Sequence, residues 1–454
     1  MIVSTDPSTG QELRRFDAHS PAQVEQILAS AHRAQSAWGA LPVPERSQLL
    51  VRVAQVLRRN RAAYAGLITA EMGKPITEAE SEIEKSAWTC EFYAQHAARY
   101  LADQQIPSEA ADSRVVFDPL GVVLAVMPWN YPFWQFLRFA APALAAGNAA
   151  LLKHANNVPQ CALAIEAAFV EAGAPAGLVA TLLVEASEVA GVLADDRVAA
   201  ITLTGSTAVG KIVAAQAGSL MKKQVLELGG SDPFIVLADA DVEAAARAAV
   251  KARFSNAGQS CISAKRFIVE DAVADRFVEA FCAGTRQLKV GAPADRATQI
   301  GPLARDNLRN DLHTQVLRTV AAGATLVLGG QAIEGPGYFY PPTVLDHVQP
   351  DMAAAVEETF GPAAAVIRVR DAEEAIRLAN ATEFGLGAAL WTRDTARAAR
   401  LARRIEAGAV FINAQVASDP RLPFGGVKQS GYGRELGEFG IREFTNIKTV
   451  WTGT

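Results

Sequence analysis

Apolar residues in the first hundred positions recur every three or four residues. Two successive sets show this interval, namely Val24, Ile27, Leu28 and Ala31, and then Leu49, Leu50, Val53, Val56 and Leu57. Such a period places the apolar side chains on one face of a helix. We therefore predict that residues 21–105 form amphipathic helices that cover a core built elsewhere in the chain.

From Gly121 onward the pattern changes to short, β-rich apolar runs with amphipathic segments between them. The runs cover residues 122–127, 149–153, 178–184, 199–204 and 224–228. Continuous apolar runs joined by helical segments are typical of parallel strands that are buried on both faces. The sequence therefore predicts a doubly wound α/β sheet.

A second alternating series follows and predicts a second α/β domain. Its helices are expected from Asp241 onward and over residues 274–288. Its strands are expected at residues 234–237 and 266–270 and near Leu326, Val344, Ala365, Leu390 and Val410. Two further β-like segments, residues 114–117 and 446–451, lie outside both series. Exposed strands of this kind need an edge to pair with, such as one on another subunit.

Composition narrows the class of protein. A length of 454 residues predicts two or three domains at roughly 150 residues each. The chain is 50% apolar and 20% charged, which excludes intrinsic disorder and collagen-like or repeat architectures. Lys and Arg total 43 against 48 Asp and Glu, a net charge of −5 without a long run of one sign. We therefore expect neither nucleic acid nor an anionic membrane as a partner.

Three further observations favour a cytoplasmic protein. No uninterrupted run of about 18 apolar residues occurs, so no membrane span is expected. The first residues lack the basic-then-apolar pattern of an export signal. The four cysteines are too few for a disulfide framework and are expected to be reduced thiols, any of which could be a reagent; they are Cys90, Cys161, Cys261 and Cys282.

Residues 203–210 close one predicted strand and open a helix. Gly205 permits a tight turn there, and Ser206 or Thr207 could bind an anionic oxygen together with the free amides of the helix start. A phosphate would fit such a site. The alternative is a simple helix cap, because the segment lacks the GxGxxG pattern.

Cys261 ends a turn of small residues, where a carbonyl group could approach its sulfur. The alternative is an inert buried thiol. Nucleophilic chemistry would require a pKa lowered from about 8.5, or a proton acceptor nearby. None of the six histidines forms a Cys-His or metal-spaced pair. A papain-like protease is therefore weakly supported, and no metal site is expected.

Two polar residues stand at the ends of predicted strands. Glu227 lies in an apolar strand before two glycines, and it is either paired structurally or faces a cavity as a general base with a raised pKa. Asn130 follows the first parallel strand, where ligands bind in open α/β sheets, and its amide suits an oxyanion unless it is only a turn residue. On the next helix, Trp134 and Arg138 share a face.

These segments, taken together and in this order, resemble the aldehyde dehydrogenase superfamily over essentially the whole chain. The landmarks are Leu-Glu-Leu-Gly-Gly-Ser at 226–231, Asn-Ala-Gly-Gln-Ser-Cys at 256–261, Glu-Glu-Thr-Phe-Gly-Pro at 357–362 and Pro-Phe-Gly-Gly-Val-Lys-Gln-Ser-Gly at 423–431. Each is ordinary alone, and the combination is very specific. Residues 129–135, 152–156 and 431–436 further resemble the bacterial succinate-semialdehyde dehydrogenase group.

The resemblance implies a fold of three parts. A Rossmann-type NAD(P)-binding domain would cover residues 1–105 and 120–229, and an α/β catalytic domain would cover residues 230–432. Residues 106–119 and 433–454 would form a small β oligomerisation module that is donated to a neighbour's sheet. A homodimer or homotetramer is therefore implied.

The resemblance also implies a mechanism. The Cys261 thiolate attacks the aldehyde carbon, and the Asn130 side chain and the Cys261 backbone N–H hold the oxyanion. Hydride passes to the nicotinamide and leaves a thioester on Cys261. Glu227 then activates water, which releases the acid.

For the cofactor, the resemblance implies Lys153 and Glu358 on the two riboses, Ser206 near the pyrophosphate and Phe360 beside the nicotinamide. Trp129, Asn156 and Gly205 are further expected cofactor-binding residues. Asn156 stands where many NAD-preferring relatives carry a Glu. A carboxylate there would repel a 2′-phosphate, so its absence admits NADP. We expect use of NADP at least comparable to that of NAD.

The implied substrate is a small aldehyde, with succinate semialdehyde favoured. Arg138, with Trp134 beside it, is the arginine best placed for the distal carboxylate, and Ser260 and Ser418 could add hydroxyls. The alternative role for Arg138 is a surface salt bridge. Other small aldehydes such as glutarate semialdehyde, and a non-catalytic scaffold protein, stay open as alternatives, whereas Glu227 disfavours a coenzyme A-acylating enzyme.

Overall fold

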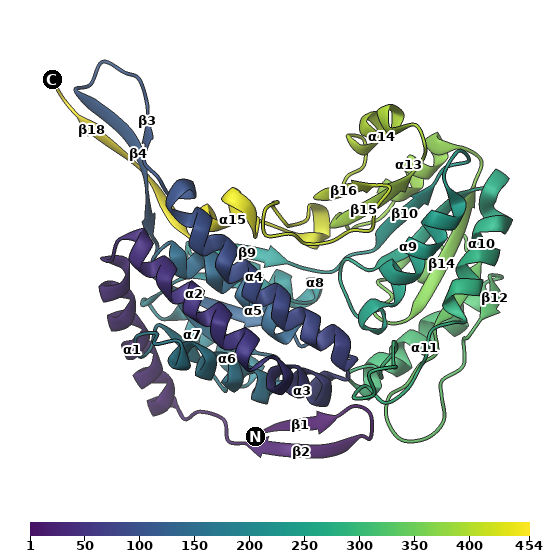
Figure 1. Cartoon of the computed structure of the whole chain (residues 1–454), viewed down its shortest axis with the longest axis horizontal. Coiled ribbons are helices and arrows are strands. Elements are labelled where there is room, and N and C mark those ends of the chain that lie inside the picture. The colour runs from purple at the N-terminus through teal and green to yellow at the C-terminus, as the bar shows by residue number, and fades with distance from the viewer.

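The computed structural model describes residues 1–454 and consists of two halves, each built on an open sheet (Figure 1). The first half holds a six-stranded sheet in the order β17-β9-β8-β5-β6-β7, in which only β17 and β9 pair antiparallel. Its strands are β5 (Val122–Met127), β6 (Ala149–His154), β7 (Val179–Thr181), β8 (Val198–Thr204), β9 (Lys223–Glu227) and β17 (Gly431–Tyr432). All five predicted runs are strands, so the predicted doubly wound sheet is confirmed.

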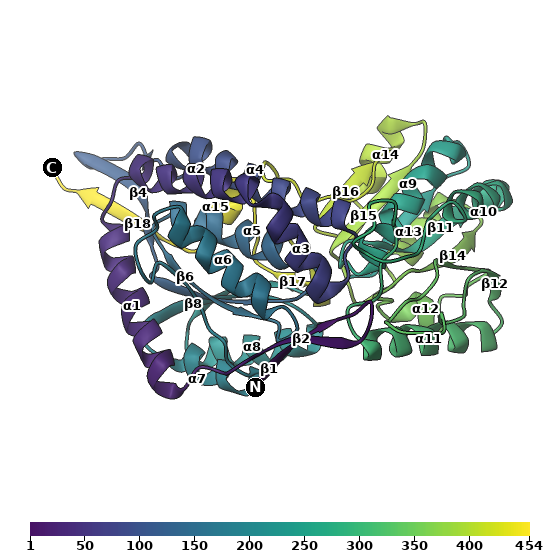
Figure 2. The ribbon, with the colours of Figure 1, turned by 60° about the horizontal axis from the view of Figure 1, so that its bottom comes forward.

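Helices cover both faces of this sheet. Figure 2 shows α5 and α6 on one side and α7 and α8 on the other. The predicted cover helices are α1 (Pro21–Gly39), α2 (Val43–Arg59), α3 (Arg61–Met72) and α4 (Ile76–Tyr100), and the crossovers contain α5 (Pro132–Ala145), α6 (Pro159–Glu171), α7 (Val189–Ala194) and α8 (Thr207–Ser219). On α2 the apolar set predicted from its spacing is buried, which confirms that face. Ser20 begins α1 with a capping box to Gln23.

The second half holds a seven-stranded sheet in the order β12-β13-β14-β11-β10-β15-β16, parallel except for β12. Its strands are β10 (Asp232–Val236), β11 (Ala264–Glu270), β12 (Thr325–Leu328), β13 (Thr343–Asp346), β14 (Ala363–Val369), β15 (Gly387–Trp391) and β16 (Ala409–Ile412). Its helices are α9 (Val242–Phe254), α10 (Asp271–Thr285), α11 (Asp306–Ala321), α12 (Ala353–Val356), α13 (Ala372–Asn380) and α14 (Thr395–Ala402). The predicted second α/β series is confirmed.

The two outlying β-like segments pair with each other. β4 (Asp112–Pro119) lies between β3 (Gln104–Gln105) and β18 (Thr445–Thr452), and all pairs are antiparallel. This three-stranded arm projects from the first half (Figure 1). The outer edge of β18 has no partner strand in this chain.

Some elements of the fold were not predicted from the sequence. The hairpin of β1 (Ile2–Asp6) and β2 (Gln11–Phe16) is one. Another is the return of the chain end to the first half, where β17 joins β9 and α15 (Gly437–Glu443) leads into the arm. None of the helices has both the length and the apolar character needed to cross a membrane.

Candidate active site

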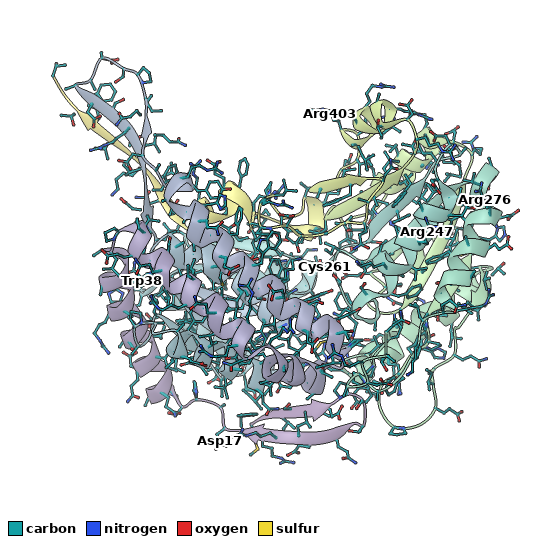
Figure 3. All side chains as sticks on the ribbon, viewed as in Figure 1. Asp17, Trp38, Arg247, Cys261, Arg276 and Arg403 are labelled. Atoms are coloured by element: carbon teal, nitrogen blue, oxygen red, sulfur yellow. The ribbon has the colours of Figure 1, made fainter.

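Cys261 lies where the two halves of the molecule meet (Figure 3). It follows the 3₁₀ turn Ser255–Gly258 and precedes β11. Asn256, Ala257 and Gly258 have φ values of 53°, 52° and 71°, in the left-handed region. A Cβ on residue 258 would lie 2.4 Å from the Gly361 carbonyl oxygen, so only glycine fits there. This tight turn sets the direction in which Cys261 leaves the backbone.

A buried lysine holds the Cys261 loop. The Lys265 Nζ donates hydrogen bonds to the carbonyl oxygens of Ser260 (3.1 Å), Cys261 (2.9 Å) and Ser263 (3.2 Å). The same Nζ lies 3.7 Å from Oε1 of Glu358. Lys265 was not predicted from the sequence, although a lysine within an apolar strand directly after a candidate nucleophile is a recognisable signal.

Asn130 and Cys261 line one cavity, described below, and each of them has a free hydrogen-bond donor. The buried Asn130 Nδ2 donates to the Gln259 carbonyl oxygen (2.9 Å), which leaves its second hydrogen without a partner in the protein. The backbone N–H of Cys261 has no acceptor in the structure. A side-chain amide and a backbone N–H are the kinds of donor that stabilise an oxyanion.

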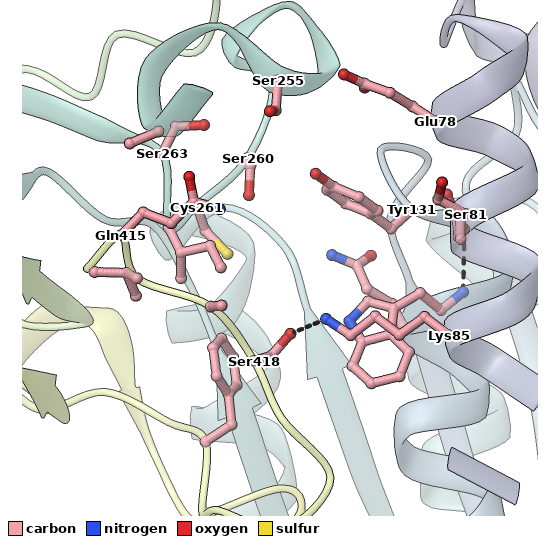
Figure 4. A pocket seen from close by; sticks show the side chains of 18 of the residues that line it. Glu78, Ser81, Lys85, Tyr131, Ser255, Ser260, Cys261, Ser263, Gln415 and Ser418 are labelled. Atoms are coloured by element: carbon pink, nitrogen blue, oxygen red, sulfur yellow. Dashed lines mark hydrogen bonds between the residues drawn. The ribbon is translucent and has the colours of Figure 1, made fainter. Parts of the chain in front are cut away.

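Cys261 lines two cavities. The first has a volume of about 400 Å³ and lies among α4, α5 and residues 415–418 (Figure 4). All four predicted substrate residues line it, namely Trp134, Arg138, Ser260 and Ser418. The second has a volume of about 330 Å³ and is lined by Trp129, Asn130, Gly205, Ser206, Glu358 and Phe360. The structure thus brings most of the predicted residues to the two sides of one sulfur.

The second cavity has the features that a dinucleotide needs. Ser206 caps α8, whose first amides face this side of the sheet, and the rings of Trp129 and Phe360 meet edge to face with centroids 5.8 Å apart. Glu358 Oε1 accepts a hydrogen bond from the Gly230 N–H (2.9 Å). At Gly229 an added Cβ would lie 2.7 Å from Glu358 Oε2, so this wall leaves no room for a side chain. The residues present therefore fit a nicotinamide dinucleotide.

The acid and thiol groups of the site are shifted toward their neutral forms. Burial raises the pKa of the Cys261 thiol to about 12. Burial, and then the neighbouring Glu435 carboxyl, raise the pKa of Glu227 well above its usual range. Both carboxyl oxygens of Glu227 lack hydrogen-bond partners, and the side chain lines neither cavity. The Glu227 carboxyl is therefore buried, without a hydrogen-bond partner and outside both cavities.

Arg138 carries a salt bridge, but it is a buried one. Its guanidinium pairs with Glu435, and both side chains are 3% exposed. Its Nη2 also lies 3.4 Å from Thr204 Oγ1, and its Cζ stacks 4.7 Å from the centre of the Phe424 ring. Arg138 therefore borders the first cavity while it is paired with Glu435.

Comparison with known proteins agrees with this geometry. The model of the family described as "Aldehyde dehydrogenase family" matches residues 1–450. The chain belongs to the aldehyde dehydrogenase family. It is 51% identical over 450 residues to a Synechocystis sp. protein named "Probable succinate-semialdehyde dehydrogenase (NADP(+))", with 99% of each chain covered.

Other relatives of this aldehyde dehydrogenase are similar over their full lengths. An Escherichia coli (strain K12) succinate semialdehyde dehydrogenase named for NAD(P)+ is 46% identical, with 99% of this chain and 97% of that protein covered. A crystal structure of succinic semialdehyde dehydrogenase from Streptococcus pyogenes, in complex with NADP+, superimposes with a TM-score of 0.97 at 38% identity, and all of both chains is covered. The fold class predicted from the sequence is therefore confirmed.

In this aldehyde dehydrogenase, Lys153 and Asn156 lie at the end of β6 and line neither cavity. The Lys153 Nζ donates to Asn156 Oδ1 (2.8 Å), and Asn156 Nδ2 donates to Glu185 Oε2 (2.7 Å). A carboxylate therefore does stand beside this pair, although it comes from residue 185. Sequence reasoning missed Glu185 because it lies 29 positions along the chain from Asn156.

Helix α4 supplies cavity residues that sequence reasoning also missed. Lys85 donates from Nζ to Ser418 Oγ (2.7 Å) across the first cavity. Glu82 pairs with Lys74, and its Oε1 accepts from the N–H groups of Phe133 (2.9 Å) and Trp134 (3.1 Å). A signal existed, since Glu78, Glu82 and Lys85 recur at helical spacing and so share one face of α4.

Proposed function

We propose that this protein is an NAD(P)+-dependent dehydrogenase that oxidises succinate semialdehyde to succinate. The position of the Cys261 sulfur, in the wall shared by the two cavities, carries the proposal. One cavity suits a dinucleotide, and the other is lined by charged and hydroxyl groups that suit a carboxylate. Relatives about half identical over the full chain carry this activity in their names. Another small aliphatic aldehyde or a semialdehyde such as glutarate semialdehyde is the alternative.

In the proposed reaction the Cys261 sulfur forms a bond to the aldehyde carbon. Because burial raises the pKa of this thiol to about 12, its proton must leave to a base as that bond forms. The two free donors, Asn130 Nδ2 and the Cys261 N–H, would stabilise the negative oxygen.

The second cavity would hold the cofactor. Gly205 and Ser206 at the start of α8 would bind the pyrophosphate, and Glu358 would bind one ribose. Lys153, at the end of β6 outside this cavity, would bind the other ribose. Trp129 and Phe360 would border the nicotinamide, which when bound accepts the hydride. Although Glu185 places a carboxylate beside Asn156, relatives named for NADP+ support use of NADP at least comparable to that of NAD. Steady-state kinetics showing NAD preferred about a hundredfold would reject this.

Glu227 would complete the reaction by taking a proton from the water that cleaves the thioester. Burial and the Glu435 carboxyl raise its pKa well above the usual range, so Glu227 must first lose its own proton to act as this base. The released product is the carboxylic acid.

Assembly, location and domain limits belong to the same proposal. The arm ends in β18, where Ile447 and Trp451 are 61% and 52% exposed, so we infer a homodimer or homotetramer in which the arm contacts another copy.

The four cysteines are all free, as expected for a cytoplasmic enzyme. We keep residues 1–105 with 120–229 as the cofactor domain, residues 230–432 as the catalytic domain, and residues 106–119 with 433–454 as the bridging segments.

An aldehyde panel tests the proposed substrate. Steady-state kinetics with succinate semialdehyde, glutarate semialdehyde and butanal should give the highest kcat/KM for succinate semialdehyde. Cys261→Ala should abolish turnover of all three while it leaves the circular dichroism spectrum unchanged. Activity retained by Cys261→Ala, or equal kcat/KM for succinate semialdehyde and butanal, would contradict the proposal.

A further inference from the structure

Lys85 is a cation in the wall of the first cavity without a carboxylate partner. Its ammonium lies 4.1 Å from the centre of the Trp134 ring and donates to Ser418 Oγ at 2.7 Å. No Asp or Glu oxygen lies within ion-pair distance of its Nζ. Figure 4 shows Lys85, Ser418 and Cys261 around the same space. The cavity therefore joins the reactive sulfur to an uncompensated positive charge.

The other charged side chains of this cavity are already paired or hydrogen-bonded, or they lie at its margin. Arg138 is paired with Glu435, and Glu82 is paired with Lys74. Glu78 accepts a hydrogen bond from the Asn256 N–H, and Lys251 is exposed on α9. An anion that enters the cavity consequently finds its free cation at Lys85.

Ser418 adds a second donor at the same point. Its oxygen accepts the hydrogen bond from Lys85, and its own hydroxyl hydrogen has no acceptor in the protein. An ammonium and a hydroxyl that meet in this way can each donate to one oxygen of a carboxylate. The Trp134 ring beneath the ammonium holds it in place through a cation–π contact.

We propose that Lys85, with Ser418, binds the carboxylate of an ω-carboxy aldehyde while the aldehyde carbon lies at Cys261, and so selects anionic over uncharged substrates. This inference rests on the proposed function, which it makes more specific. It assigns to α4 the selective charge that the sequence analysis placed on Arg138.

The charge state of Lys85 is consistent with this role. Burial, assisted by the positive charge of Arg138, lowers the pKa of the Lys85 ammonium to about 8, so the group is still charged at pH 7. Asp419 and Glu82 are the acidic groups whose charges act on it. Asp419 is itself paired with Arg421, which leaves Lys85 available.

The test compares Lys85→Met with wild type on succinate semialdehyde and on butanal, which has the same chain length without the carboxylate. We expect KM for succinate semialdehyde to rise about tenfold or more, with kcat and both constants for butanal changed less than about twofold. Lys85→Arg should restore part of the loss. Lys251→Met, which removes an exposed charge at the same cavity, should change KM less than about twofold.

The outcomes separate this inference from the function on which it rests. If wild type does not favour succinate semialdehyde over butanal, the proposed function is wrong. Suppose that wild type favours succinate semialdehyde. If Lys85→Met then leaves KM for succinate semialdehyde and for butanal unchanged, or raises the two KM values equally, Lys85 does not select the carboxylate. Should Lys85→Met not fold, as judged by circular dichroism, Ser418→Ala provides the second test, with KM expected to rise several-fold for succinate semialdehyde alone.

Discussion

The thiol of Cys261 is governed by two opposing influences. Burial raises its pKa to about 12, while the charges of Arg138 and Lys265 act in the opposite direction but do not prevail. The group is therefore a neutral thiol at physiological pH in the free enzyme.

The pH dependence of alkylation at Cys261 follows from this pKa. Because only the thiolate reacts, the rate with iodoacetamide should be low at pH 7 and rise about tenfold per pH unit up to at least pH 10. The rate can be followed by mass spectrometry of the peptide that contains Cys261, in the enzyme without cofactor. A rate that levels off near pH 8.5 would show an ordinary thiol and contradict the assignment.

Asn130 should matter for the transition state rather than for the reactivity of the sulfur. Removing one oxyanion donor typically costs about 10² to 10³ in rate, so Asn130→Ala should lower kcat/KM by about that factor. The iodoacetamide rate of Cys261 serves as the control, and it should change little. A loss below about threefold would remove Asn130 from the oxyanion site.

Arg138 should contribute to stability through its buried pair. Arg138→Ala leaves Glu435 buried without its cation, and such losses are typically about 3–5 kcal/mol in the free energy of unfolding. Urea denaturation at pH 8 measures this, with Arg138→Ala/Glu435→Gln as the matched control that should recover most of the loss. Equal stability of the single variant and wild type would show that the pair contributes nothing.

At the scale of elements, the site depends on one short turn and one long helix. The turn Ser255–Gly258 directs Cys261 toward both cavities. Helix α4 provides Lys85 and also Glu82, whose carboxylate caps the first amides of α5. Because α5 carries Trp134 and Arg138, this contact from α4 positions the wall of the first cavity that α5 forms.

The turn gives a prediction for Gly258. Gly258→Ala places a Cβ against the Gly361 carbonyl oxygen at a positive φ, which should cost about 1–3 kcal/mol and displace Cys261, with a loss of kcat. Gly66→Ala is the control, since an added Cβ on α3 meets nothing within 4 Å and should be neutral or stabilising. Thermal unfolding and kcat are measured together, and an unchanged kcat in Gly258→Ala would contradict the role of the turn.

At the scale of the whole molecule, the arm offers a test of assembly. Ile447→Lys with Trp451→Lys places charges on the exposed face of β18, and we expect these changes to lower the mass measured by multi-angle light scattering toward that of a single chain. Ile333→Lys changes an exposed apolar residue of the other half and should leave the mass unchanged. An unaltered mass in the double variant would place the interface elsewhere.

The sequence alone determined the order and kind of most elements. Apolar sets at helical spacing predicted α1 and α2 within a helical region that also holds α3 and α4. Apolar runs predicted the strands of both sheets except β17, because burial on one helix face or on both sheet faces leaves a local pattern in the chain. The motifs around Glu227, Cys261 and Asn130 indicated the family, since close backbone packing at a reactive group restricts the residue types at neighbouring positions.

Only the tertiary structure decided which charges are free. The sequence indicated Arg138 as the cation of the site, and Lys85 was missed. In the fold, Glu435, nearly 300 positions away from Arg138, pairs with Arg138, whereas no carboxylate pairs with Lys85. The same holds for Glu185 beside Asn156 and for Lys265 beneath the Cys261 loop. Such a pair forms between residues that are distant in the sequence and become neighbours only in the folded chain. The local pattern of apolar and polar residues therefore cannot predict it.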